Sequence, residues 1–328
     1  MDANWYIINK SNKIISKTDK QSINMRAFIF PGQGCQHEGM GLELYNNFPE
    51  ARELFEQANE YFGRRISDVM FHGDELELMK TENTQPAVFL YEVVAATVQK
   101  TITPDVVAGH SLGEFAALVI AGVISFEDGL NLVLNRATIA QQVCEKFKTG
   151  MGAVIGLSDE YVAKRIKEIW NESGEPIYFA NYNGPGQVVI TGSKKGVRLA
   201  CKAFQKEGAK KAVPLLIGGS FHSPYMEEAG AQLGEIIRDI SFHKARFPVY
   251  QCVDALPHTV PEEIRKNLIQ HITHPVRWTE MTYNMERDGV TEFYEVGTDD
   301  TLQKIVSRMC PMLKVSSINE AEEYLNIL

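Results

Sequence analysis

One serine lies in a setting typical of an enzymatic nucleophile. Residues 109–113 read Gly-His-Ser-Leu-Gly, which matches the Gly-x-Ser-x-Gly pattern of a nucleophile elbow. A short apolar run ends at Gly109 and a helix-like run begins at Leu112, so Ser111 falls in a tight turn between a strand and a helix. The backbone N–H after the serine and the start of the helix can stabilise an oxyanion. The pattern predicts that Ser111 briefly carries an acyl group; the structural alternative is a serine that caps a helix.

A serine nucleophile needs a general base, and the chain has eight histidines that could serve. His110 is too close to Ser111 along the elbow to aim easily at its hydroxyl. His222 lies in a Gly-rich turn before a predicted helix, which suits an exposed loop at the edge of a sheet. The sequence favours His222, but by itself it leaves His271 and His274 open.

Composition excludes several other classes of protein. The net charge of −9 argues against non-specific nucleic-acid binding, which needs a basic surface. No apolar run approaches the roughly 20 residues of a membrane span, and the polar first 24 residues lack the apolar core of a signal peptide. The five cysteines include no Cys-x-x-Cys pair, so we expect reduced thiols in a cytoplasmic protein and no metal site.

The elements that position these residues indicate an α/β fold. A buried strand is expected over 26–30, running into a Gly-rich loop, and another precedes the elbow, as in a parallel sheet. A helix is predicted over 85–99, with Pro86 in its first turn, and a second over about 126–147. With 328 residues, 44% of them hydrophobic, the chain can form one large domain and a smaller one.

The middle of the chain follows a different pattern. Between about 150 and 217 the predicted elements follow the order β-α-β-β-α-β, which is the ferredoxin-like arrangement. Helices and strands then alternate again. We therefore expect an N-terminal extension over 1–24, a large domain over 25–147 and 220–328, and an inserted subdomain over 148–219.

A series of short motifs lies in order over nearly all of residues 25–328. No single motif is decisive, but the ordered set is specific. The motifs are Phe-Pro-Gly-Gln-Gly at 30–34, Thr-Gln-Pro-Ala at 84–87, Gly-His-Ser-Leu-Gly-Glu at 109–114, Arg136, Asn-Tyr-Asn-Gly-Pro-Gly-Gln at 181–187, Phe-His-Ser at 221–223, Pro-Val-Arg-Trp at 275–278 and Glu-Val-Gly at 295–297. This set resembles the malonyl-CoA:acyl-carrier-protein transacylases, the discrete acyltransferases of fatty-acid or polyketide synthesis.

The resemblance implies an α/β-hydrolase-like domain with an inserted ferredoxin-like subdomain, and a mechanism. Ser111 attacks the thioester of malonyl-CoA, while His222 takes the serine proton and returns it to the leaving thiol. The backbone N–H groups of Gln33 and Leu112 hold the oxyanion. The phosphopantetheine thiol of an acyl carrier protein then attacks the malonyl ester, in a two-step transfer that needs no metal or cofactor. The implied partners are a coenzyme A thioester and the carrier protein, and we expect a monomer.

The resemblance also assigns the substrate-binding residues. Arg136, which on the residues alone is typical of a solvated helix position, is implied to bind the free carboxylate of malonyl, because guanidinium matches carboxylate in a planar, two-pronged way. Phe221 is implied to crowd a substituent on the acyl α-carbon, which favours malonyl over methylmalonyl. The remaining expected substrate-binding residues are His110, Gln85, Asn183 and His271.

The chain departs from the family pattern near the predicted base. His271 stands where the family has glutamine, and in the family the main-chain carbonyl at this position orients the base. The side-chain change should therefore leave the base working, although a second imidazole can alter its pKa.

Two other functions are compatible with the fold class. An acyl hydrolase that unloads carrier proteins often lacks the carboxylate-binding arginine, so Arg136 argues against it. A non-catalytic module that docks on carrier proteins has no need of Ser111, His222 and Arg136 together. Carrier proteins are typically acidic, and the cations predicted to steer them are Lys194, Lys195, Lys210 and Lys211.

Overall fold

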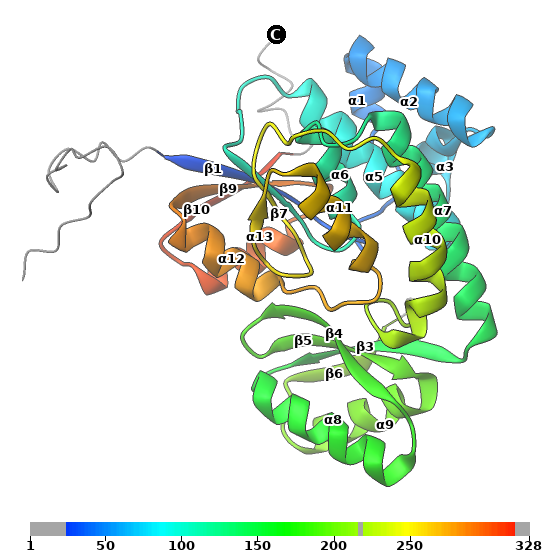
Figure 1. Cartoon of the computed structure of the whole chain (residues 1–328), viewed down its shortest axis with the longest axis vertical. Coiled ribbons are helices and arrows are strands. Elements are labelled where there is room, and N and C mark those ends of the chain that lie inside the picture. Colours follow the sequence, from blue (N-terminus) through cyan, green and yellow to red (C-terminus); the bar gives the residue numbers. More distant parts are fainter. Residues whose placement is uncertain (1–23, 216–218, 319–328) are drawn as a thin grey trace, which may run out of the picture.

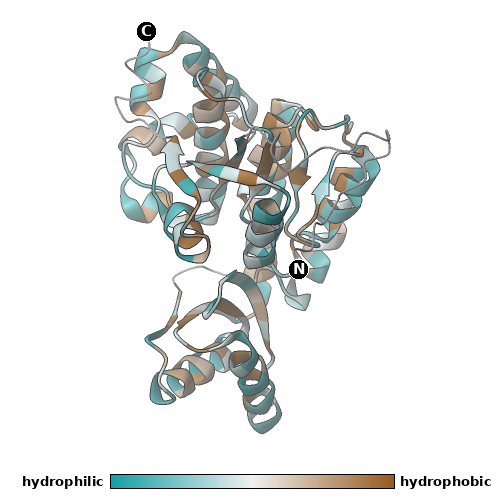
Figure 2. Ribbon diagram, turned by 90° about the vertical axis from the view of Figure 1, so that its left-hand side faces the viewer, coloured by the Kyte–Doolittle hydropathy of each residue, from teal (hydrophilic) through white to brown (hydrophobic). Residues whose placement is uncertain are grey.

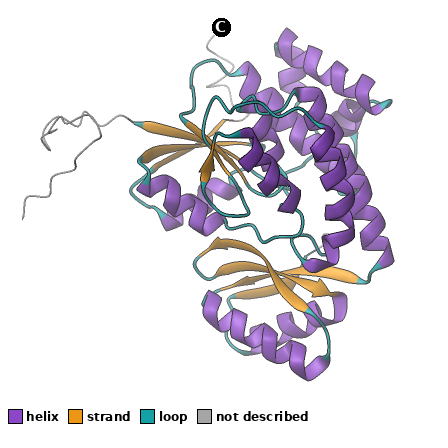
Figure 3. Ribbon diagram, in the orientation of Figure 1, coloured by secondary structure: helices purple, strands orange, loops and turns teal. Residues whose placement is uncertain are grey.

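The computed structural model describes residues 24–215 and 219–318, which form two sheets with helices packed around them (Figures 1 and 3). The expected extension over 1–24 lies almost wholly outside the described residues. Among the helices of the described part, none is both long enough and apolar enough to span a bilayer.

The larger sheet has six strands in the order β10-β9-β1-β2-β7-β8. All neighbouring strands are parallel except β7 and β8. The strands are β1 (Met25–Phe30), β2 (Val106–Gly109), β7 (Val249–Tyr250), β8 (Pro257–His258), β9 (Val290–Val296) and β10 (Lys314–Ile318). The helices of this domain are α1 (Leu42–Asn47), α2 (Pro49–Phe62), α3 (Ile66–His72), α4 (Glu75–Leu78), α5 (Thr81–Val98), α6 (Gly113–Ile120), α7 (Phe126–Lys146), the short 3₁₀ helix η1 (Pro224–Met226), α10 (Glu227–Asp239), α11 (Pro261–Gln270), α12 (Trp278–Arg287) and α13 (Thr301–Met309).

Alternating residues of β1 and β2 build cores on opposite faces of this sheet. Phe28, Phe30 and Val107 pack with the helices α2, α5, α6 and α10. Ile29 and Ala108 pack with α12 and α13 on the other face. Because both faces are covered, the central strands are continuous apolar runs, and such runs are what identified them in the sequence.

The smaller sheet has four antiparallel strands in the order β4-β5-β3-β6, and this order and the connections are ferredoxin-like. One face packs on two amphipathic helices, along which hydrophobic and hydrophilic stretches alternate in Figure 2. The other face points toward the large domain. The elements of the small subdomain are β3 (Thr149–Ile155), α8 (Asp159–Ser173), β4 (Ile177–Gly184), β5 (Gln187–Ser193), α9 (Lys194–Lys206) and β6 (Lys211–Pro214). The expected two-part α/β fold is confirmed, while the boundaries at 148 and 219 stay predictions.

The prediction for the helix over 85–99 was wrong at its start. Helix α5 begins at Thr81, so Pro86 lies inside the helix rather than in its first turn. Proline has no N–H, and the carbonyl of Glu82 therefore loses its helical donor. The guanidinium of Arg64 donates to that carbonyl at 2.9 Å and replaces the missing bond.

Candidate active site

Ser111 occupies the sharp turn between β2 and α6, with a positive φ of 53°. The glycines on either side of it are required by close backbone contacts. A methyl group on Gly109 would lie 2.0 Å from the backbone nitrogen of Glu114, and one on Gly113 would lie 2.2 Å from the carbonyl oxygen of Phe30. The Gly-x-Ser-x-Gly spacing therefore allows the elbow to pack against the end of β1.

The side chain that faces the Ser111 hydroxyl is His222. The distance from Ser111 Oγ to His222 Nε2 is 2.6 Å. On the other side of the ring, Nδ1 lies 3.1 Å from the carbonyl oxygen of His271 and 3.0 Å from that of His274. Because carbonyl oxygens only accept, Nδ1 carries the proton and Nε2 accepts from the serine hydroxyl. The imidazole is thus held in the tautomer that a general base needs.

The other two histidines that the sequence left open contribute carbonyl groups here rather than rings. The ring of His274 is exposed, and its Nδ1 lies 3.0 Å from the carbonyl oxygen of Gln270. The ring of His271 packs edge-on against the ring of His222, with centroids 5.4 Å apart. The geometry thus selects His222 among the three candidates.

Burial keeps the His222 ring neutral. His222 is 2% exposed, and desolvation, followed by the charge of Arg136, lowers its pKa to about 3. Burial also lowers the pKa of His110. Neutral His222 can therefore accept a proton over the whole physiological pH range.

Arg136 of α7 points its guanidinium at the serine. Its Nη2 donates to Ser111 Oγ at 3.3 Å, and its Nη1 donates to Gln85 Oε1 at 2.7 Å. The rings of Phe221 and Phe115 lie 5.2 and 5.8 Å from the guanidinium carbon. Two aromatic rings and one amide thus hold the cation beside the nucleophile.

This cation is buried without a counter-ion. Arg136 is 1% exposed, so the solvated position that its sequence alone suggested is wrong. Burial lowers its pKa to about 10, which leaves it charged at neutral pH. Over the described residues no carboxylate comes within 4.0 Å of its guanidinium, and its Nε has no hydrogen-bond partner. A buried charge without a partner is costly, so the site is suited to an anion that arrives with the substrate.

The two predicted oxyanion donors lie close to this arrangement. Gln33 lines the same pocket as Ser111, and its side-chain oxygen accepts from Gln85 Nε2 at 3.4 Å. Leu112 directly precedes α6. Among the described residues, the backbone N–H groups of Gln33 and Leu112 have no hydrogen-bond partner, so neither is already committed to an acceptor within the protein.

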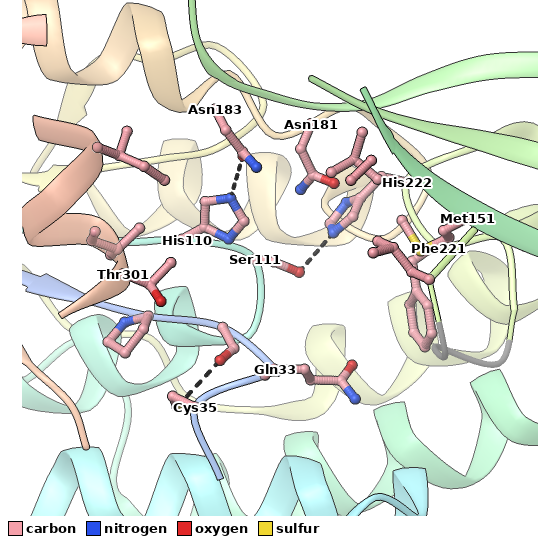
Figure 4. A pocket seen from close by; sticks show the side chains of 18 of the residues that line it. Gln33, Cys35, His110, Ser111, Met151, Asn181, Asn183, Phe221, His222 and Thr301 are labelled. Carbon is pink, nitrogen blue, oxygen red and sulfur yellow. Dashed lines mark hydrogen bonds between the residues drawn. The ribbon is translucent and has the colours of Figure 1, made fainter. Parts of the chain in front are cut away.

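The pocket lies between the two sheets and has a volume of about 360 Å³ (Figure 4). From the small sheet, Asn183 accepts from His110 Nε2 at 2.8 Å. Phe221 closes one side and is 3% exposed. All predicted site residues therefore gather around Ser111 except His271, whose side chain lies behind the pocket.

Asn181 also lines this pocket, although only Asn183 was predicted as a substrate-binding residue. The two residues are two apart on β4, and residues i and i+2 of a strand share one face. Strand alternation was thus a signal that could have identified Asn181.

Comparisons with known proteins agree with this site. Residues 27–320 match the family model of the acyl transferase domain. The malonyl CoA-acyl carrier protein transacylase of Bacillus subtilis is 38% identical over 298 residues, which cover 90% of this chain and 94% of that protein.

Solved structures of related enzymes have the same fold. The malonyl CoA-acyl carrier protein transacylase of Coxiella burnetii superposes with a TM-score of 0.88 at 33% identity, covering 92% of this chain and 96% of that one. A malonyl-transacylase solved in complex with its type II polyketide synthase acyl-carrier protein also gives 0.88, at 34% identity, covering 93% of this chain and 99% of that one. The chain therefore belongs to the acyl transferase family, within the group of malonyl CoA-acyl carrier protein transacylases.

Proposed function

We propose that this protein transfers a malonyl group from coenzyme A to the phosphopantetheine thiol of an acyl carrier protein, through an ester on Ser111. It does so as a cytoplasmic monomer, and no metal or bound cofactor takes part in the transfer. Its carrier protein serves fatty-acid or polyketide synthesis.

The observation that carries the proposal is the unpaired Arg136. Its guanidinium lies 3.3 Å from Ser111 Oγ, so a carboxylate bound to Arg136 would be next to the nucleophile. In malonyl, one carbon separates the carboxylate from the thioester carbonyl. An acyl group with this short spacing can place its carboxylate on Arg136 and its carbonyl on Ser111 at the same time. An acetyl group has no carboxylate and leaves the buried cation unpaired.

In the first half-reaction, Ser111 Oγ attacks the thioester carbonyl of malonyl-CoA while its proton moves to His222 Nε2. The carbonyls of His271 and His274 stabilise the resulting imidazolium, because both accept from Nδ1. The oxyanion accepts from the free N–H groups of Gln33 and Leu112. When the intermediate collapses, the C–S bond breaks and His222 returns the proton to the thiolate of coenzyme A.

In the second half-reaction the carrier thiol replaces coenzyme A. His222 takes the thiol proton as sulfur attacks the malonyl ester, and it then returns a proton to Ser111 Oγ as the ester C–O bond breaks. Phe221 limits the space around the acyl α-carbon. We propose a preference for malonyl over methylmalonyl of roughly 1–3 kcal/mol, as expected for one methyl group.

We place carrier contacts on the small subdomain. Lys194 and Lys195 open helix α9 and, with three further cations, line a shallow depression. Lys210 lines a second depression that shares Ile305 with the catalytic pocket. This basic surface complements an acidic carrier protein, despite the net charge of −9.

Intact-mass spectrometry of the protein tests the proposal. After mixing with malonyl-CoA, a malonyl adduct should form on the wild type and be absent in Ser111→Ala, and holo carrier protein should remove it. Parallel reactions with methylmalonyl- and acetyl-CoA should give less adduct. Hydrolysis of the adduct faster than its transfer would instead support an acyl hydrolase, and a complete lack of adduct would support a docking module.

A further inference from the structure

A second group of polar side chains lies behind the nucleophile elbow, away from the pocket. It consists of Glu114 on α6, Cys252 after β7 and His271 after α11, and we call it the inner cluster. Each residue contributes one potential metal-ligand atom, and these atoms all lie within 4.8 Å of one another. None of the three residues is more than 1% exposed.

Neither ring nitrogen of His271 makes a hydrogen bond of normal geometry among the described residues, although the Ser111 backbone lies near the ring. Its Nε2 faces Glu114 and lies 3.9 Å from the nearer carboxylate oxygen, which is too far for a hydrogen bond. Buried polar groups are almost always paired, so an unpaired buried imidazole suggests a missing partner, such as an ion or a water molecule.

The chemistry of the inner cluster suits a borderline-soft divalent cation. Thiolate, imidazole and carboxylate are the ligands that Zn²⁺ takes in tetrahedral sites, with bonds of about 2.0–2.3 Å. Such bonds separate the ligand atoms by about 3.3–3.8 Å. Side-chain rotations that move each ligand atom by roughly 1 Å or less would therefore bring the three atoms to the spacing of a tetrahedral site. The carbonyl oxygen of Gly109, which accepts from Cys252 Sγ at 3.1 Å, is a candidate for the fourth ligand.

Neighbouring groups already hold the carboxylate in place. Glu114 accepts from Gln251 Nε2 at 3.0 Å and from the backbone N–H of Cys252 at 2.7 Å. These contacts leave lone pairs on both carboxylate oxygens, and such secondary bonds are typical around metal ligands. One carboxylate and one thiolate, formed by loss of the Cys252 proton to solvent, balance the charge of a divalent cation.

We propose that Glu114, Cys252 and His271 bind one zinc-type divalent cation behind the Ser111 elbow. The cysteine spacing in the sequence predicted no metal site. This site could not be found from spacing, because its three ligands come from distant segments that only the fold brings together. Binding does not depend on the acyl transfer proposed above. The ion would be bound by the His271 ring, while the main-chain carbonyl of the same residue orients the His222 base.

The three ligands are buried, so the ion must enter during synthesis or local opening. The test therefore uses full-length protein expressed in medium supplemented with Zn²⁺ or Co²⁺ and then passed over a chelating resin. Elemental analysis of the zinc-grown protein should find about one ion per chain. The cobalt-grown protein should show a thiolate-to-cobalt charge-transfer band and tetrahedral d–d bands. Its Tm should exceed that of metal-depleted protein by a few degrees.

Variants locate the ion. Cys252→Ala should abolish the charge-transfer band, and His271→Gln should lower the metal content by at least tenfold. Cys310→Ala, which changes another cysteine that is 2% exposed, should retain both signals. Circular dichroism establishes that each variant is folded. The proposal is overturned if wild-type protein retains no metal, or if folded Cys252→Ala and His271→Gln both retain it.

Discussion

The two sheets face one pocket but supply it with different kinds of side chain. The large domain contributes the nucleophile, the base and the cation, namely Ser111, His222 and Arg136. Of the pocket residues that the structure describes, those of the small sheet are amides or apolar groups, such as Asn183 and Met151. Proton transfer and charge thus belong to the large domain, while the small subdomain determines the shape of the pocket.

The comparison shows why the chemistry lies where it does. The turns that follow parallel strands are held in place by a rigid sheet, so their side chains have fixed positions. Ser111 lies in a turn of this kind, directly after β2. The small sheet is attached to this frame through Val276, which donates to the carbonyl of Ala180 and accepts from the N–H of Tyr182. We therefore expect large losses of activity from changes in the large domain and graded effects from changes in the small subdomain.

Removal of the base should have the largest effect. His222→Ala leaves Ser111 without a proton acceptor and should lower the rate of malonyl-enzyme formation by about 10³-fold. Rapid-quench mass spectrometry measures this rate. His243→Ala, which changes an exposed histidine, is the control and should match the wild type. A loss below tenfold in His222→Ala would place the base elsewhere.

A substitution on the small sheet should reduce activity less than removal of the base does. Asn183→Ala removes the acceptor of the His110 ring and should lower kcat/KM for malonyl-CoA by about tenfold, as expected for one partly buried hydrogen bond. Steady-state kinetics with a saturating carrier protein measure this value. A loss as large as that of His222→Ala would mean that the small sheet takes part directly in the chemistry.

Carrier recognition should respond to surface charge on the small subdomain. The double variant Lys210→Glu, Lys211→Glu should raise KM for the carrier protein about three- to tenfold, most strongly at low salt, because it reverses charges on an exposed surface. Malonyl-enzyme formation from malonyl-CoA is the internal reference. The matched control is Lys164→Glu, Lys167→Glu on α8, which should leave KM within twofold. Equal effects of the two double variants would contradict this docking surface.

Acid should act on the fold rather than on the base. Burial lowers the pKa values of His110, His222 and His271, so below pH 6.5 these three groups bind more protons in the unfolded chain than in the native one and lower its stability. Glu92, Glu114 and Glu295 act in the opposite direction, because burial raises their pKa values. Acylation should change little between pH 7 and 5, since the pKa of His222 is about 3.

Urea unfolding at several pH values, with a chelator present, measures how the free energy of unfolding changes with pH. His271→Gln removes one buried neutral histidine and should lower the slope of unfolding free energy against pH by up to about 1.4 kcal/mol per pH unit below pH 6.5. Its turnover should stay within tenfold of the wild type, because the main-chain carbonyl that holds His222 is retained. An unchanged slope would mean that His271 is not titrated differently in the two states.

The sequence predicted those parts of the molecule that depend on local pattern. The Gly-x-Ser-x-Gly elbow, the β-α-β-β-α-β order and the helix over about 126–147 all follow from short-range rules, and the structure has each of them. Strand β8, with two residues, and strand β10, which is only partly buried, give weak periodic signals and were not predicted. The helix that contains Pro86 was misplaced because a distant residue, Arg64, compensates for the proline.

The site was harder to predict from the sequence, because its geometry depends on contacts between residues that are far apart in the chain. Sequence reasoning from single residues treated Arg136 as solvated, because nothing local indicates that Gln85 and two aromatic rings enclose it. The resemblance to a family supplied its role. The inner cluster has no local pattern at all, since tertiary packing alone brings Cys252 to Glu114.

The measurement that tests the central claim most directly compares malonyl and acetyl transfer in Arg136→Ala. Without the guanidinium, the malonyl carboxylate would be buried unpaired, so malonyl transfer should fall by about 10²–10³-fold while acetyl transfer changes by less than tenfold. Arg136→Lys should give an intermediate loss, because an ammonium group lacks the two-pronged geometry. Equal losses for the two acyl groups would contradict the assignment of Arg136, and with it the proposal that malonyl is the group carried on Ser111.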